Sequence, residues 1–285
     1  MLTILFDGIA YGMVLFVLAS GLSVTLGLMN FVNLAHGAFA MAGGYATVIL
    51  MQRYGVSFLW TLPAAFLFSA ILGVVLERLL YRPMYAKSHL DQVMFSIGLV
   101  FMAVAGTDYL MGSTQQIIRL PTWLQGRFDV MGVGIGKYRL FVIILCGLLA
   151  VCLQYGFTRT RFGSRLRAAV DDARVARGLG IPVNQLFAFT FAIGSGLAGL
   201  GGALGIELLG LDPNFPLKFM IYFLIVVTVG GTSTITGPFL AAMLLGVADV
   251  AGKYFVPQIG AFIIYALMVI VLLAKPEGLF ARARK

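Results

Sequence analysis

Long apolar runs separated by short polar connections dominate this chain. Four stretches contain no Asp, Glu, Lys or Arg, namely residues 8–52, 178–206, 219–248 and 254–274. Each is longer than the roughly 20 residues that an α-helix needs to cross the hydrocarbon core of a bilayer. The pattern therefore predicts an all-α polytopic membrane protein.

The apolar pattern resolves into nine segments, at about residues 4–28, 31–51, 57–77, 92–111, 139–157, 183–209, 218–231, 238–252 and 258–274. Gly, Thr and Pro interrupt those near 31–51, 218–231 and 238–252, so we expect one or two of them to be broken or re-entrant. The sequence predicts one transmembrane domain, residues 1–285, with about 8–9 transmembrane helices.

Composition supports this class and excludes others. The chain is 60% hydrophobic and 11% charged over 285 residues, and a soluble domain of that size cannot bury so much apolar surface. Its net charge of +9 comes from basic residues in the connections, where they face anionic lipid and set orientation. We therefore expect the lipid bilayer as a partner and no nucleic acid.

A charged island interrupts the apolar pattern at residues 158–182. It contains six of the 20 basic residues and two acidic ones: Arg159, Arg161, Arg165, Arg167, Arg174, Arg177, Asp171 and Asp172. The island is too polar to lie in lipid and too short to be a domain. We interpret it as a helical hook on the cytoplasmic face.

The distribution of Lys and Arg orients the chain. If the hook is cytoplasmic, parity places the connection 78–91 and the C-terminal tail on the same side, with 13 of the 20 basic residues, as the positive-inside rule requires. The N-terminus and the connection 112–138 then lie outside. That connection is either a docking surface for a partner or an ordinary loop, and both interpretations stay open.

Within the hook, Ser164 is the expected N-cap of a helix over residues 165–177. One side of that helix is an apolar stripe: Leu166, Ala169, Val170, Ala173 and Ala176. Gly178, Gly180 and Pro182 are expected to end it. Such a hook either gives soluble partners a grip or lies passively on the lipid surface.

Two breaks in the apolar pattern resemble each other. Residues 25–42 and 228–242 both contain Thr-x-Gly, then a polar stretch, then Gly-x-Phe-x-x-Ala. The likeness indicates either an internal parallel repeat or a chance match. Backbone groups freed there must face protein or water rather than lipid. The candidate substrate-pathway residues are therefore Asn30, Asn33, His36, Thr232 and Thr234. His36 is alternatively a helix-end histidine bonded to a backbone carbonyl.

Small residues four apart fill the segment 183–209, which predicts the closest helix packing in the bundle. No Gly-Lys-Ser/Thr follows, so this is no nucleotide loop. The acidic residues Asp7, Asp108, Glu207 and Asp249 fall near predicted span ends, without a basic partner at helical spacing in their own spans. We expect them to reach the interface rather than form a proton relay.

Two motifs carry a resemblance to a known family. The first runs Asn33-Leu34-Ala35-His36-Gly37, with Gly27, Asn30 and Gly43-Gly44-Tyr45 around it. The second runs Arg167-Ala168-Ala169-Val170-Asp171-Asp172, with Ala176 and Leu179-Gly180-Ile181. With the Gly-rich span, Gly230-Gly231-Thr232 and Gly237-Pro238, the chain resembles branched-chain amino-acid ABC importer permeases. Its start at the first span is more like the shorter, H-type subunit.

The resemblance implies a bundle with no ATPase site that binds no cofactor or metal, since ATP is used by partner subunits. The implied partners are a second homologous permease, two cytoplasmic ATP-binding subunits and a periplasmic solute-binding protein, all at the bacterial inner membrane. The implied coupling residues are Arg165, Arg167, Ala168, Ala169, Asp171, Asp172, Ala173, Ala176 and Gly180.

The cargo implied is a branched-chain or related hydrophobic amino acid, and relatives of the family that carry urea or short amides stay as an alternative. A stand-alone secondary carrier is a second alternative, which needs a mid-membrane carboxylate for ion coupling. An intramembrane enzyme is disfavoured, because the sequence shows no Ser/His pairing, His-Glu metal motif or close carboxylate pair.

Overall fold

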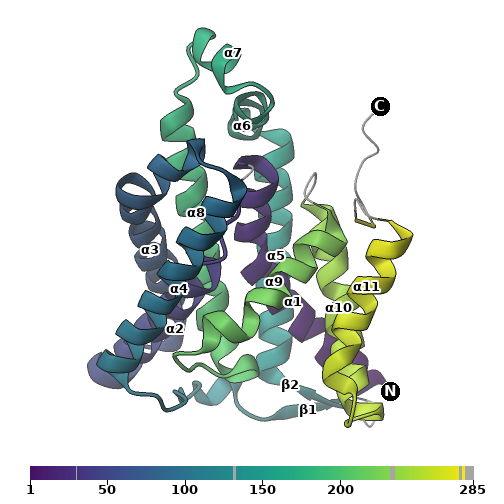
Figure 1. Ribbon diagram of the computed structural model, residues 1–285. Helices are drawn as coiled ribbons and strands as arrows, with labels where there is room; N and C mark the ends of the chain where they lie inside the picture. Colours follow the sequence, from purple (N-terminus) through teal and green to yellow (C-terminus); the bar gives the residue numbers. More distant parts are fainter. Residues whose placement is uncertain (30, 131–132, 232–234, 276–277, 280–285) are drawn as a thin grey trace.

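The computed structural model describes residues 1–29, 31–130, 133–231, 235–275 and 278–279 and shows a bundle of long helices (Figure 1). Its helices are α1 (Leu2–Met29), α2 (His36–Tyr54), α3 (Phe58–Leu76), α4 (His89–Met111), α5 (Lys137–Arg159), α6 (Arg161–Asp171), α7 (Ala173–Gly178), α8 (Val183–Leu209), α9 (Phe215–Gly230), α10 (Thr236–Phe255) and α11 (Gly260–Ala274). A π-helical turn (Glu77–Tyr81) and a 3-10 turn (Arg82–Ala86) extend α3.

The nine predicted apolar segments correspond to α1–α5 and α8–α11, with boundaries that differ by a few residues. In the described part of the chain, six helices are long and apolar enough to cross a membrane: α1, α3 with its extension, α4, α5, α8 and α10. The largest boundary difference is in α2, which begins at His36 rather than near residue 31. The preceding residues form the break that the sequence predicted inside that segment.

The two ends of the bundle carry different elements. Figure 1 shows the hook, α6 and α7, at one end together with the last turn of α11, and the N-terminus at the opposite end. Counting nine crossings from the sequence predicted the same arrangement, with the hook and the end of the last helix on one side and the N-terminus on the other. We call these the hook end and the opposite end.

A small hairpin at the opposite end was not predicted. The strands β1 (Arg127–Val130) and β2 (Val133–Gly136) pair antiparallel within the connection 112–138, with Arg127 opposite Gly136. Strands of four residues show little alternation, and glycine weakens strand propensity. Gly134 and Gly136 therefore read as turn formers in the sequence, although both lie in β2.

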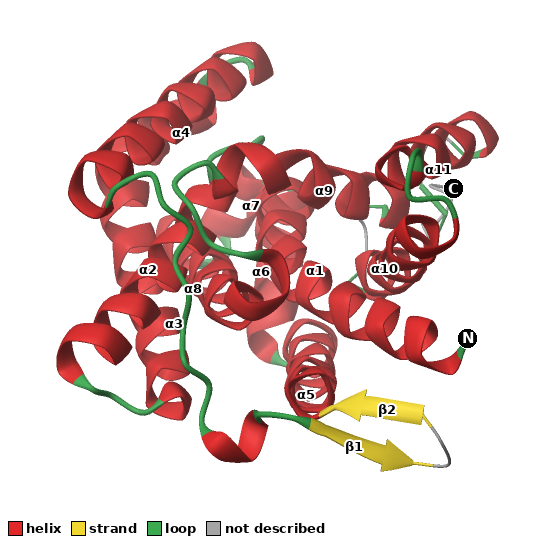
Figure 2. Ribbon diagram, turned by 90° about the horizontal axis from the view of Figure 1, so that it is seen from below, coloured by secondary structure: helices red, strands yellow, loops and turns green. Residues whose placement is uncertain are grey.

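The helix α8 forms the centre of the bundle, surrounded by α1, α2 and α3 (Figure 2). In the most apolar 18-residue stretch of α8, 83% is buried inside the bundle, compared with 11% in the corresponding stretch of α4. A Cβ on Gly202 would collide with the backbone of Ala40 in α2, and one on Gly199 would lie 2.8 Å from the Ala65 carbonyl oxygen of α3. The close packing predicted from the small-residue spacing is confirmed.

One prediction about acidic residues was wrong. Asp249 does not reach the interface, because its side chain is 1% exposed and pairs with Lys253 one turn further on, Nζ to Oδ2 at 2.6 Å. The predicted span ended at residue 252, whereas α10 continues to Phe255 and brings this lysine into the same helix. Asp7 pairs with Arg139 of α5.

Replacing Gly202 with Leu should destabilise the bundle, because the added side chain meets backbone that cannot move aside. Overpacking of this kind costs about 1–3 kcal/mol or more, so we expect a clearly lower thermal midpoint of the purified protein in detergent. Gly98→Leu on α4 is the matched control, since a Cβ there meets nothing within 4 Å. Equal midpoints for both variants would contradict the packing described.

Candidate functional site

The hook begins earlier than its sequence predicted. Thr160, not Ser164, is the N-cap of α6, and its hydroxyl oxygen accepts a hydrogen bond from the Gly163 backbone N–H at 3.3 Å. The Ser164 hydroxyl instead donates to the Arg161 carbonyl at 3.0 Å. The helix therefore starts at Arg161, where α5 has just ended.

The hook is also two helices rather than one. Asp172 interrupts the predicted helix 165–177, because its Oδ1 accepts from the backbone N–H groups of Arg174 at 2.8 Å and Val175 at 2.9 Å. Aspartate is among the best N-cap residues and competes with helical hydrogen bonding in a helix interior. The result is a bend after α6 and a short second helix, α7.

The predicted apolar stripe is present and faces the protein itself. Leu166, Ala169 and Ala176 are at most 2% exposed. They pack in one cluster with Val24 of α1, Phe157 of α5, and Val183 and Leu186 of α8. Because the bundle covers this face, the hook does not lie with its stripe on lipid.

Arg167 attaches the hook to the end of α5. Its guanidinium Nη1 donates a hydrogen bond to the Phe157 carbonyl, and Gly163 lies so close to the Phe157 backbone that a Cβ would collide with it. Arg167 thus positions the hook. Of the other predicted coupling residues, Ala173 is half-buried, and those exposed are Arg165, Ala168, Asp171, Asp172 and Gly180.

The outer surface of the hook presents apolar side chains that the sequence-based list omitted. Val175 is 57% and Leu179 75% exposed, flanked by the exposed Arg174 and Arg177. Figure 1 shows α7 as the part of the chain farthest from the bundle. In the sequence, Val175 and Leu179 lie outside the apolar stripe, so packing against the bundle does not explain why these two positions are apolar. This mismatch could have identified them as surface residues available to a partner.

The first break lies between α1 and α2. Asn30 lies outside the described residues. Asn33 is 1% exposed, and its Oδ1 accepts a hydrogen bond from the Tyr81 hydroxyl at 3.1 Å. His36 is 2% exposed, and its Nε2 lies 2.7 Å from the Leu18 carbonyl oxygen in the middle of α1. His36 therefore has the carbonyl contact expected of a helix-end histidine.

Distant residues hold this break in place. The Gln92 side chain accepts from the Val32 backbone N–H at 3.2 Å and donates to two carbonyls of the α3–α4 connection, Met84 and Lys87, at 3.3 Å each. The Phe31 ring packs edge-on against Tyr81 at 5.5 Å. Sequence reasoning missed Gln92 and Tyr81, because their partners are far away in the chain.

An apolar crevice reaches the same break from the outside. It measures about 320 Å³ and lies between α2, α3 and α4, and its lining includes Ala35, Ala38, Leu72, Leu99 and Tyr81. Tyr81 therefore connects the crevice to Asn33. The Asn33 Nδ2 has no hydrogen-bond acceptor among the described residues.

The second break lies between α9 and α10. Thr232 and Thr234 lie outside the described residues. At its edges, a Cβ on Gly230 would collide with Pro238, and the Leu279 N–H donates to the Val229 carbonyl at 2.8 Å. The internal repeat stays a prediction.

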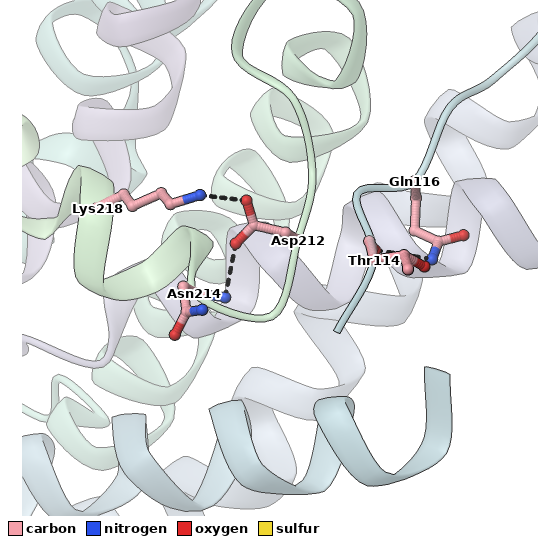
Figure 3. Close-up of polar contacts among 5 residues, drawn as sticks. All are labelled: Thr114, Gln116, Asp212, Asn214 and Lys218. Atoms are coloured by element: carbon pink, nitrogen blue, oxygen red, sulfur yellow. Dashed lines mark hydrogen bonds and ion pairs between the residues drawn. The ribbon is translucent and has the colours of Figure 1, made fainter. Parts of the chain in front are cut away.

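A polar cluster at the start of α9 was not predicted (Figure 3). The Asp212 carboxylate accepts from the Asn214 backbone N–H at 2.8 Å and forms an ion pair with Lys218. Beside it, the Gln116 N–H donates to the Leu211 carbonyl at 2.7 Å. These contacts join the connection 112–138 to the start of α9.

Comparison with known proteins gives one consistent result. The protein-family model described as branched-chain amino acid transport system / permease component matches residues 4–272. The chain is 28% identical to the high-affinity branched-chain amino acid transport system permease protein BraD of Pseudomonas aeruginosa, over 98% of this chain and 95% of that protein.

Two further relatives are similar over most of the chain. The permease protein LivH of Escherichia coli K12 is 25% identical over 98% of this chain and 94% of its own length. The permease protein LivM of Salmonella typhimurium is 26% identical over 95% of this chain and 69% of its own length. No solved structure matches the chain.

Proposed function

The chain belongs to the family of permease components of branched-chain amino acid transport systems, and we propose that it carries branched-chain or related hydrophobic amino acids inward, driven by separate ATPase subunits. As a member of this family it is a permease subunit of an ABC importer, not an enzyme, and a multi-pass protein of the bacterial inner membrane. The names of the relatives support the proposed cargo.

The proposed importer contains a second, homologous permease. Both LivH and LivM match this chain, which supports a pair of related permeases. Coverage of 94–95% of the LivH and BraD relatives, compared with 69% of LivM, supports the H-type role. Two ATP-binding subunits would bind ATP at the hook end, and a periplasmic solute-binding protein would dock at the opposite end.

The observation that carries the proposal is the anchored hook. Its outer surface is exposed, apolar at the tip and rich in arginine, whereas its inner stripe is buried against α1, α5 and α8. A force on the tip would pass through Ala169 and Ala176 to Val24 of α1 and Leu186 of α8. Closure of the ATPases on ATP would thereby tilt the two helices at the centre of the bundle.

The proposed substrate route follows the first break. Asn33, His36 and, outside the described residues, Asn30, Thr232 and Thr234 stay candidates for this route. The apolar crevice, whose lining includes Ala35 and Ala38, supports a cargo with an apolar side chain. The secondary-carrier alternative gains no support from Asp249, because Lys253 already compensates its charge.

Reconstitution tests the proposed function directly. Proteoliposomes that contain the permease pair and its ATPases should accumulate leucine only when ATP and the solute-binding protein are both supplied. Vesicles with the permeases alone are the control and should show no uphill uptake. Accumulation against a gradient without the ATPases would refute the proposal, and ATP-driven uptake of urea but not leucine would correct the cargo.

Leu179→Asp should uncouple the hook from its ATPases. The substitution removes exposed apolar surface at the tip without touching the buried stripe, so we expect at least a tenfold loss of ATP-dependent uptake with an unchanged thermal midpoint. Ala169→Glu is the contrast, because a carboxylate in the buried cluster should lower the midpoint as well. Normal uptake by the Leu179 variant would exclude the tip from the docking surface.

Asn33→Leu tests the substrate route. The substitution removes both the acceptor for Tyr81 and the free amide, while Tyr81→Phe removes only the hydrogen bond between them. If Asn33 contacts cargo, its variant should raise the apparent KM for leucine severalfold more than the Tyr81 variant. If both variants leave the apparent KM unchanged and each lowers the free energy of unfolding by about 1 kcal/mol, Asn33 is a purely structural residue.

A further inference from the structure

A groove lies between α5 and α10 on the outside of the bundle. Both helices pack against α1, and Figure 2 shows them on either side of that helix. At the hook end, the Thr236 hydroxyl of α10 donates to the Gln154 side chain of α5 at 3.4 Å. The groove measures about 740 Å³, within the range of about 300–1,000 Å³ typical of small-molecule sites. Its lining is Phe16, Gly147, Ala150, Val151, Gln154, Tyr155, Thr158, Arg159, Ile235, Thr236 and Phe239.

The groove is apolar along its length and polar at one end. The partly exposed Phe239 belongs to its apolar lining and packs edge-on against the fully buried Phe16 beneath it, with ring centroids 5.2 Å apart. Gly147 and Val151 lie along the α5 wall. The polar residues are those nearest the hook end: Gln154, Tyr155, Thr158, Arg159 and Thr236.

The length of the groove matches one leaflet of a bilayer. Twelve residues separate Gly147 from Arg159, so the α5 wall is about 18 Å long at ~1.5 Å per residue. Half of the hydrocarbon core is about 15 Å thick. With Arg159 among the headgroups, the apolar lining of the groove would span the depth of the acyl chains.

The charge at the polar end favours an anion. Among the described residues, no acidic side chain lines the groove and the exposed Arg159 has no ion pair. By the positive-inside rule the hook end faces the cytoplasm, where anionic lipids are attracted to basic clusters between membrane helices. Tyr155 suits the same interface, as tyrosines commonly do.

A lipid matches both the apolar lining of the groove and the single positive charge at its end. We propose that the groove binds one anionic phospholipid of the cytoplasmic leaflet, with an acyl chain along Val151 and Phe239 and its phosphate on Arg159. This proposal depends on the orientation of the chain but not on its cargo.

Native mass spectrometry of the complete importer, released from nanodiscs of defined lipid, tests the proposal. The wild type should retain phosphatidylglycerol about fivefold more than phosphatidylcholine, because one arginine near the surface contributes about that preference. Arg159→Gln should abolish the preference. Gly147→Phe should reduce retention of both lipids at least tenfold, since a side chain there projects into open space and fills the groove.

Two matched controls separate the groove from general effects. Arg53→Gln removes an exposed arginine at the opposite end, and Gly98→Phe adds a ring at an open position on α4, and both should retain lipid as the wild type does. Equal retention of the two lipids by the wild type, or wild-type retention by the Arg159 variant, would overturn the proposal. So would a photo-cross-linker at Val151 that labels another protein chain rather than lipid.

Discussion

Backbone-to-backbone packing around α8 is the interaction on which the rest of the structure depends. Lipid tails are as apolar as leucine, so helices in a bilayer gain little from hiding apolar surface and associate through close contact instead. Gly202 against Ala40 and Gly194 against Gly21 bring α2 and α1 to such contact. Because α1 also supports the hook and α2 begins at the first break, both candidate functional regions are held by this packing.

Interrupting a helix inside a bilayer costs free energy, because the freed backbone N–H and C=O groups find no water at that depth. At the first break, the Gln92 side chain takes the place of water at the Val32 backbone N–H. The polar side chains there are also partnered, His36 by the Leu18 carbonyl of α1 and Asn33 by the Tyr81 hydroxyl. The described residues of the break thus form a defined polar structure within the apolar bundle, bonded to α1, to α4 and to the turn that extends α3.

The inner surface of the hook packs on the bundle, and its outer surface stays exposed. Its alanine-rich stripe is narrow enough to pack on α1, α5 and α8, and Arg167 secures it to the carbonyl of Phe157. The tip keeps Val175 and Leu179 exposed, which is unfavourable in water unless a partner covers them. The predicted coupling residues therefore fall into two groups, one buried against the bundle and one exposed at the surface.

The sequence by itself determined the class, the order of nine apolar helices, the place of the hook and the tight packing of α8, because span length, charge and small-residue spacing are local properties. It failed where partners are distant. Tyr81 meets Asn33 from 48 residues away and Gln92 meets Val32 from 60. The burial of Ala169, the bend at Asp172 and the groove beside Arg159 were likewise decided by the tertiary structure, because side-chain neighbours across the bundle exist only once its helices have packed.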